Sequence, residues 1–213
     1  MAMEDFYEMG EGGRVDPGVI LGYRYPGDRE PTRIGDHAIV RSGSVIYADT
    51  VIGHRFQCGH QVVIRAETSI GDRCVVHHQC VLEGRIRIGF GVKIMAGVYL
   101  PSTTVIGDLV FIGPGTTFLN AKYPMRQAGV EGARVEDGAC IGGGVTVCPG
   151  ITIGRGAFVG AGALVNKDVP PGVLACGVPV KFRPMPDALA DGNLPELLLP
   201  QTDLWGAHED ESW

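Results

Sequence analysis

Branched aliphatic residues recur at every sixth position through most of the chain. Steps of six from Ile34 reach Phe118, and a second series runs from Val135 to Val165. Of these 21 positions only Cys58 is not Val, Ile, Leu or Phe. A period of six fits neither the 3.6-residue repeat of a helix nor the alternation of a single strand. It predicts short strands separated by turns, three to a coil, because each strand buries its apolar residue only when coils stack.

Glycine follows the same period. Of the 33 glycines, 21 lie between Gly35 and Gly162 outside the break, and all of these fall one, two or three positions after a periodic residue. Glycine suits corners where the backbone is tightly bent or closely approached, whereas flat faces favour branched side chains. The pattern therefore predicts an all-β prism of about seven coils with glycine-rich corners.

The period also divides the chain into segments. Residues 1–33 precede it and could form a lead-in, a cap or an irregular first coil. Residues 34–170 form the predicted coils, interrupted by an inserted loop at 119–134, and residues 171–213 form a closing segment and an acidic tail. Insertions in a solenoid project from one face and often serve binding.

Charge and composition exclude several classes of protein. The last thirty residues hold seven acids and neither Lys nor Arg, and the rest of the chain has 18 basic against 17 acidic groups. No basic stripe is present to neutralise phosphates, so we expect no nucleic-acid binding. No apolar run reaches the ~18 residues of a membrane span. With no signal-like N-terminus and no CxxC pair, we expect a cytoplasmic protein with reduced thiols.

The sequence after the break, ACIGGGVTVCPGITIGRGAFVGAGALVNKDVPPGVLACGVPVKFRP, resembles the closing coils of coenzyme-A-dependent hexapeptide-repeat acyltransferases. The resemblance implies a left-handed parallel β-helix, with acetyl-CoA or another acyl-CoA as co-substrate. It also implies that the backbone of Gly143 and Ala161 contacts the pantetheine amides. Lys167, Lys181 and Arg183 become candidates for the nucleotide phosphates through charge-assisted hydrogen bonds. Ordinary surface charge is the alternative for each of these three.

The inserted loop points to the acceptor. FIGPGTTFLNAKYP resembles the FTND-YP segment of nucleotide-linked amino-sugar N-acyltransferases, with Asn120 at its asparagine and Tyr123 at its tyrosine. Ala121 replaces the usual aspartate, and the upstream CGHQVVIRAETSIGD resembles the same group. The loop lacks the histidine of the HPLD-like loop of O-acetyltransferases. The resemblance implies acetylation of an amino group by direct attack on the thioester, and O-acetylation of a sugar or antibiotic is the alternative.

Two histidines are candidates for the catalytic base. His60 and His78 both lie two positions after a periodic residue and 18 residues apart, so they should stack on one corner about 4.8 Å apart. A neutral histidine can accept the proton of the attacking amine. VVHHQC, which contains His78, resembles a base-carrying segment of some bacterial amino-sugar acetyltransferases, and His60 belongs to the CGH resemblance. Either could be the base, and a polar ladder on an exposed corner is the alternative.

Other polar residues receive weaker assignments. Glu83, one coil beyond Arg65, could orient the acceptor or simply pair with that arginine. His54 falls in a column with acidic residues and is predicted to be structural. His77 is predicted to lie on the surface.

The corners also predict an assembly. Asn120 belongs to a different corner from His60 and His78, so the two groups cannot readily meet within one chain. If both act in one reaction, neighbouring chains must bring them together. We therefore expect a homotrimer with active sites between subunits, as the family resemblance also implies.

Two other functions share the predicted fold. A metal-dependent protein similar to the γ-class carbonic anhydrases needs three histidines around zinc. The positions two coils beyond His60, His37 and His77 hold no histidine, so no metal is expected. A non-catalytic solenoid used for assembly is the other alternative.

Overall fold

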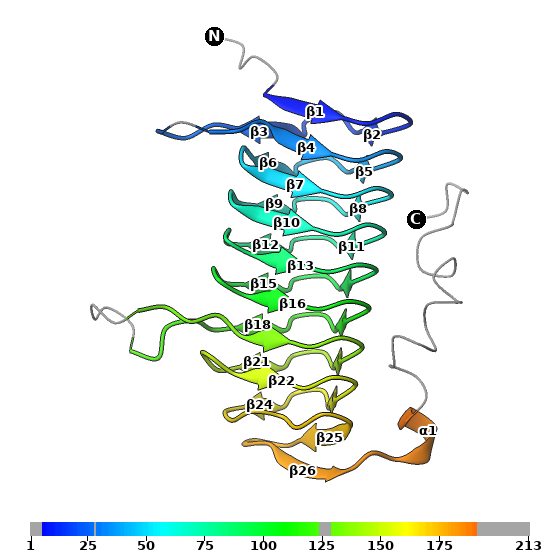
Figure 1. The fold of residues 1–213 in the computed structure, drawn as a ribbon, viewed down its shortest axis with the longest axis vertical. Helices are drawn as coiled ribbons and strands as arrows, with labels where there is room; N and C mark the ends of the chain where they lie inside the picture. The colour runs from blue at the N-terminus through cyan, green and yellow to red at the C-terminus, as the bar shows by residue number, and fades with distance from the viewer. Residues whose placement is uncertain (1–5, 28, 124–128, 191–213) are drawn as a thin grey trace.

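The computed structural model describes residues 6–27, 29–123 and 129–190. In this part of the chain three parallel sheets wind around one axis as a left-handed β-helix (Figure 1). Sheet A contains, in stacking order, β1 (Tyr7–Met9), β4 (Thr32–Ile34), β7 (Thr50–Ile52), β10 (Thr68–Ile70), β13 (Arg87–Ile88), β16 (Val105–Ile106), β19 (Arg134–Val135) and β22 (Thr152–Ile153).

The two other sheets complete the triangle. Sheet B contains β2 (Arg14–Val15), β5 (Ile39–Val40), β8 (Gln57–Cys58), β11 (Val75–Val76), β14 (Lys93–Ile94), β17 (Phe111–Ile112), β20 (Cys140–Ile141), β23 (Phe158–Val159), β25 (Val173–Cys176) and β26 (Lys181–Pro184). Sheet C contains β3 (Ile20–Tyr23), β6 (Val45–Tyr47), β9 (Val63–Ile64), β12 (Val81–Leu82), β15 (Tyr99–Leu100), β18 (Thr117–Phe118), β21 (Thr146–Val147) and β24 (Leu164–Val165).

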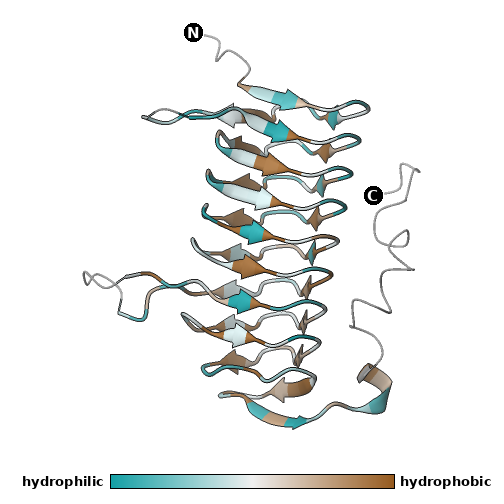
Figure 2. Cartoon of the chain, in the orientation of Figure 1, coloured by the Kyte–Doolittle hydropathy of each residue, from teal (hydrophilic) through white to brown (hydrophobic). Residues whose placement is uncertain are grey.

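The six-residue period forms the core of this prism. All 21 periodic positions are buried, and none is more than 5% exposed. Each pairs with its counterpart in the next coil, as Val76 does with Cys58 and Ile94. The other residue of each short strand faces outward; it is polar in some strands, as Arg87 is in β13, and apolar in others, as Val75 is in β11 (Figure 2). The predicted fold class is confirmed.

Cysteines contribute to the same core, as their positions in the period indicate. Cys58, Cys74 and Cys80 are buried and free. Burial raises the pKa of Cys74 to about 12 and that of Cys80 to about 11. These two therefore pack as neutral thiols.

The corners show why glycine follows the period. A Cβ at Gly53, the first residue after a strand of sheet A, would collide with the carboxylate of Asp72 in the next coil. That carboxylate accepts a hydrogen bond from the backbone N–H of His54 at 2.8 Å. Glycine in one coil thus makes room for a side chain that satisfies the neighbouring corner.

The segment before Ile34 adds one more coil. β1, β2 and β3 pair in parallel with β4, β5 and β6, so sheets A and C each have eight strands. The connection that follows β3 and the one that follows β18 both leave the corner between sheets C and A. Both project from the same side of the prism (Figure 1).

The solenoid closes with a hairpin. β25 pairs in parallel with β23, and β26 turns back antiparallel to β25. The short helix α1 (Asp187–Ala190) follows, and the predicted acidic tail beyond it lies outside the described residues. Within the described ranges no helix is long and apolar enough to span a membrane.

Replacement of a core residue should destabilise the stack. We expect Ile94→Ala, at a site with 0% exposure, to lower the free energy of unfolding by about 2–5 kcal/mol through lost burial and a cavity. Val51→Ala, at an outward position that is 51% exposed, is the matched control and should change it far less. Urea unfolding followed by circular dichroism measures both, and equal losses would contradict the assigned core.

Candidate active site

The turn from sheet B to sheet C, here called the BC corner, carries the two candidate histidines. Positions on this corner are counted from the periodic residue of each strand of sheet B, so that Ser42 is the second position after Val40. The second positions form one column along the prism, which from the N-terminal to the C-terminal end contains Ser42, His60, His78, Ala96, Pro114, Gly143 and Ala161. Four of the predicted site residues, two histidines and two backbone contacts, therefore lie on a single edge of the molecule.

The two histidines stack on this edge. Their ring centroids are 5.5 Å apart and the ring planes differ by 10°. The backbone N–H of His60 donates to Nδ1 of His78 at 3.0 Å, and Nδ1 of His60 lies 2.8 Å from the hydroxyl of Ser42. Both side chains are exposed. The predicted stacking is confirmed, and each ring turns Nδ1 toward the preceding coil.

A third histidine lies beside them. His77 is half-buried, and its ring meets that of His78 edge-on at 6.0 Å. Burial lowers the pKa of His77, with the charges of Lys93 and His78 adding to the effect. The predicted surface position is therefore wrong. The position directly after the buried Val76 is the signal that the sequence offered, because such residues lie against the face of sheet B.

Beyond His78 the BC corner is almost free of side chains. Its second and third positions are Ala96–Gly97, Pro114–Gly115, Gly143–Gly144 and Ala161–Gly162. A Cβ at Gly115, Gly144 or Gly162, the third-position glycines of the last three pairs, would meet open space. We call this stretch the bare strip. From His78 to Ala161 it covers four coil steps of about 4.8 Å each, or about 19 Å.

The bare strip also exposes backbone donors. At His60 the side chain of His78 in the next coil accepts the second-position N–H. Ala96 and Gly143 face Pro114 and Ala161 in the next coil, and those side chains contain no acceptor. Within the described part of the chain their N–H groups have no acceptor, and so they can donate to a ligand.

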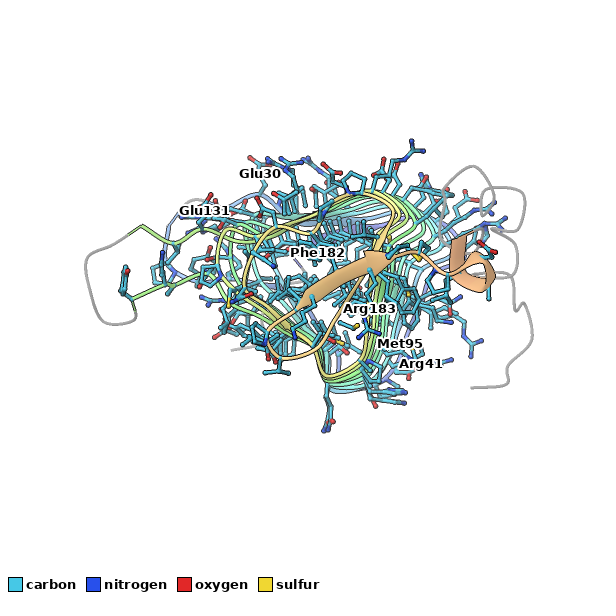
Figure 3. All side chains as sticks on the ribbon, turned by 90° about the horizontal axis from the view of Figure 1, so that it is seen from below. Glu30, Arg41, Met95, Glu131, Phe182 and Arg183 are labelled. Carbon is cyan, nitrogen blue, oxygen red and sulfur yellow. The ribbon has the colours of Figure 1, made fainter. Side chains whose placement is uncertain are left out.

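The strip ends at the closing hairpin. A Cβ at Gly160 would approach Cys176 Cβ to 3.1 Å, and Cys176 pairs with Lys181 across β25 and β26. Lys181 and Arg183 are exposed, and Figure 3 shows Arg183 on the same side of the prism as Met95. Lys167 follows β24, and its Nζ lies 4.6 Å from the ring centroid of Phe182, which stands between Lys181 and Arg183 in β26. All three predicted cations therefore reach the closing hairpin.

The predicted acceptor residues occupy the corner between sheets C and A, the CA corner. The amide nitrogen of Asn120 donates to the Ser102 hydroxyl at 3.0 Å, and Glu83 forms a 2.6 Å ion pair with Arg65. Tyr123 is exposed on the projecting loop. Asn120 therefore has a structural contact of its own, and none of these residues reaches the BC corner of the same chain.

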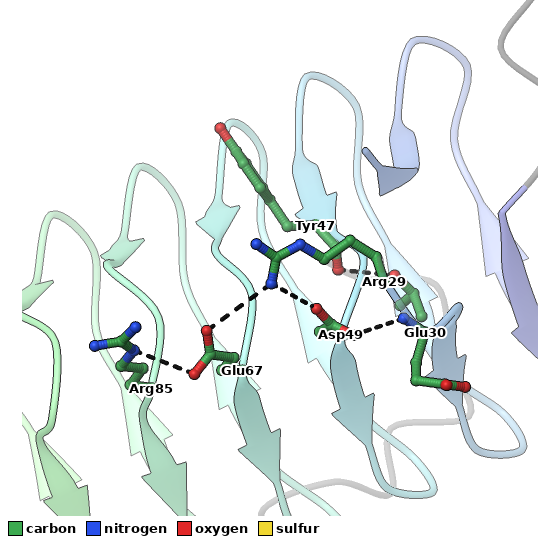
Figure 4. A network of polar contacts seen from close by, with 7 residues as sticks. Arg29, Glu30, Tyr47, Asp49, Glu67 and Arg85 are labelled. Atoms are coloured by element: carbon green, nitrogen blue, oxygen red, sulfur yellow. Dashed lines mark hydrogen bonds and ion pairs between the residues drawn. The ribbon is translucent and has the colours of Figure 1, made fainter. Parts of the chain in front are cut away.

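The CA corner nearer the N-terminus carries a ladder of charges (Figure 4). Arg29 contacts Asp49 at 3.0 Å and Glu67 at 4.0 Å, and Glu67 pairs with Arg85 at 3.1 Å. Opposite charges alternate, so the ladder neutralises itself and stabilises the corner.

A third column, on the corner between sheets A and B, explains His54. Its Nδ1 accepts the backbone N–H of Asp36 at 3.0 Å, and its own N–H donates to Asp72. This agrees with the predicted structural role. Within the described part of the chain no group of three or more His, Cys, Asp and Glu side chains could hold a metal ion.

Comparison with known proteins adds a family. The model of the bacterial transferase hexapeptide (six repeats) matches residues 85–120 and 132–167. A hexapeptide-repeat-containing acetyltransferase of Vibrio cholerae is 32% identical, with 61% of this chain and 73% of that chain covered at a TM-score of 0.45. The same protein complexed with acetyl coenzyme A gives 32% identity, coverage of 61% and 70%, and a TM-score of 0.44.

A further solved structure shares the fold. A UDP-N-acetylglucosamine acyltransferase of Bacteroides fragilis superposes with a TM-score of 0.72 at 18% identity, over 99% of this chain and 84% of that chain. No curated protein matches this chain.

The lowered pKa of His77 should be visible in solution. We expect its imidazole to titrate below the ordinary value of about 6.5, and Lys93→Gln to raise that midpoint because a nearby positive charge is lost. As the folded pKa is depressed, the unfolded chain binds the proton more readily. His77 should therefore reduce stability as pH falls below about 6.5.

Histidine NMR titration measures the midpoint, with Arg87→Gln on sheet A as the control for removal of a positive charge. A midpoint at or above 6.5 for His77, or an equal rise in both variants, would contradict the assigned environment.

Proposed function

The chain belongs to the bacterial transferases with hexapeptide repeats and is an acyltransferase, and from this premise we propose that it transfers an acetyl group from acetyl-CoA to the amino group of a nucleotide-linked amino sugar. One observation supports this most directly: the stacked histidines stand at the end of the bare strip. A proton acceptor therefore adjoins a strip of exposed backbone suited to a long, thin, amide-bearing ligand.

The bare strip fits the pantetheine arm of acetyl-CoA. An extended arm needs a smooth path and backbone partners for its amides, and the uncapped N–H groups of Ala96 and Gly143 supply donors. The exposed backbone at Ala161 continues the path. Lys181 and Arg183 would then meet the nucleotide phosphates, with Lys167 as a further candidate at the closing end. With the phosphates at the hairpin and the arm along the bare strip, the thioester would lie beside His78.

The reaction then needs a proton acceptor and a stabilised oxyanion. The amine nitrogen attacks the thioester carbonyl carbon, a C–N bond forms, and the carbonyl electron pair moves to oxygen. A histidine of the pair takes the proton from nitrogen. The C–S bond breaks, its electron pair leaves with sulfur, and the proton passes to that thiolate. The products are the N-acetyl sugar and coenzyme A.

The amine preference rests on the loop. Asn120 and Tyr123 belong to the loop that resembles those of amino-sugar N-acyltransferases. The Glu83 carboxylate is paired with Arg65 at 2.6 Å, so it would orient the acceptor only as part of that ion pair. O-acetylation of a sugar or antibiotic is the alternative within this class.

A homotrimer would unite the two corners. The outer side of sheet C carries Val45, Val63, Val81 and Tyr99, all half-buried in the single chain. Three prisms that turn this apolar face toward a common axis would bury it. The BC corner of one subunit would then adjoin the CA corner of the next, with His78 and Glu83 at the same level because they belong to one coil.

A screen of acceptors tests the reaction. We expect coenzyme A release from acetyl-CoA with nucleotide-linked amino sugars, and much less with the same sugars carrying a hydroxyl in place of the amine. Free aminoglycosides provide a second comparison. Activity only with hydroxyl acceptors would replace the proposed function with the O-acetyl alternative.

Mixed trimers test the shared site. The double variant His60→Ala/His78→Ala and the variant Asn120→Ala should each lose activity alone. In a cyclic trimer mixed at random in equal amounts, about one quarter of the sites combine intact histidines from one chain with an intact Asn120 from the next. We therefore expect about one quarter of wild-type activity. No recovery in trimers shown to be mixed by mass spectrometry would contradict a site between subunits.

A further inference from the structure

The hydrogen bond to His78 determines which of its nitrogens carries a proton. Its Nδ1 lies 3.0 Å from the backbone N–H of His60, and a backbone N–H can only donate. Nδ1 must therefore be the unprotonated nitrogen, and the single proton of the neutral imidazole lies on Nε2. A second proton would set two N–H groups against each other. His78 is consequently built to donate from Nε2.

His60 has a different partner. Its Nδ1 lies 2.8 Å from the hydroxyl of Ser42, which can both donate and accept. By rotating, that hydroxyl accepts from Nδ1–H and leaves Nε2 free to take a proton. The same bond survives when the ring becomes an imidazolium, because Nδ1–H still donates to Ser42. His60 can therefore cycle between neutral and charged forms without losing its hydrogen bond.

From these two environments we infer that the stacked histidines divide the work: His60 accepts the proton of the attacking amine, and His78 donates a hydrogen bond to the oxyanion. Ser42 is a positioning residue that holds His60 in both protonation states. The inference rests on the proposed function and extends it, because it assigns one role to each ring.

The order of residues along the BC corner agrees with this division. His78 adjoins Ala96 and the bare strip, so it meets the thioester carbonyl first. His60 lies one coil farther from the strip, beyond the thioester end. The direction of the strip thus agrees with a contact between His78 and the thioester oxygen, and the hydrogen bonds distinguish the role of His60.

The spacing also suits one reaction centre. The ring centroids are 5.5 Å apart, and the rings are nearly parallel. Across a tetrahedral carbon, the oxyanion and the amine nitrogen are about 2.3 Å apart by ordinary bond lengths. Hydrogen bonds of about 2.9 Å from each can reach two donors or acceptors at such a separation. The amine nitrogen loses its proton to Nε2 of His60, while Nε2–H of His78 stays on His78 and stabilises the oxygen.

NMR of the imidazole nitrogens in the whole protein tests the assignment without any substrate. We expect His78 to be the Nε2–H tautomer at neutral pH and His60 to carry its proton on Nδ1. A His78 with its proton on Nδ1, or a His60 with its proton on Nε2, would overturn the division.

Paired substitutions provide the second measurement. His78→Gln places an amide N–H near the position of Nε2, whereas His78→Asn places an oxygen near Nδ1 and removes the donor. We expect His78→Asn to lower kcat about 10²–10³-fold and His78→Gln to retain at least tenfold more activity than His78→Asn. Both His60→Gln and His60→Asn should lose about 10²–10⁴-fold, because neither amide accepts a proton.

Two further variants complete the set. Ser42→Ala should lower kcat while leaving KM for acetyl-CoA unchanged, and Ser42→Thr, which restores a hydroxyl, should recover it. His54→Asn, on another corner, is the control and should leave activity unchanged. Loss of the Gln-over-Asn difference at position 78 in an active enzyme overturns the division. If the wild-type chain acetylates no acceptor, the proposed function fails, and the tautomers still decide the inference.

Discussion

Hydrogen bonds between successive coils govern this molecule. Most strands pair in parallel with the strand 18 residues away, as Val75 does with Lys93, and across the inserted loop the separation is 29 residues, as between Val105 and Arg134. The side chains of each coil follow that register. A residue and its counterpart one coil on are therefore always neighbours. This pairing stacks the aliphatic residues into the core, and it also stacks the polar residues into columns on the corners. Stability and chemistry here are consequences of one repeated contact.

Because of that pairing, much of the architecture could be predicted from the sequence. The 21 aliphatic positions identify the core, and the shared phase of His60 and His78 predicts their stacking. The first coil was harder to recognise. Met9, Val15 and Leu21 are spaced by six, but they pair with Ile34, Val40 and Ile46 at a separation of 25 residues. The longer connection after β3 shifts the phase, so a count that starts at Ile34 does not include them.

The candidate site could be predicted only in part. The position of a residue within the six-residue period gives the corner on which it lies. It therefore shows that Asn120 and the histidines lie on different corners. It does not give the partner of a ring nitrogen, which depends on whether the preceding coil offers a backbone N–H or a hydroxyl. It also does not give burial, and His77 is half-buried because it lies against sheet B beside Lys93 and His78. Glycine is likewise only part of the corner rule, since residues such as Arg55 and Gln61 adopt the same positive φ.

The bare strip has a further property that follows from the solenoid. Its length is a whole number of coils, and a coil cannot be added in fractions without moving every later side chain to a wrong face. The distance from His78 to the closing hairpin can therefore change only in increments of about 4.8 Å. The fold therefore fixes the distance between the histidines and the hairpin in steps of one coil. A donor molecule of a different length would reach both the histidines and the hairpin only by bending or stretching.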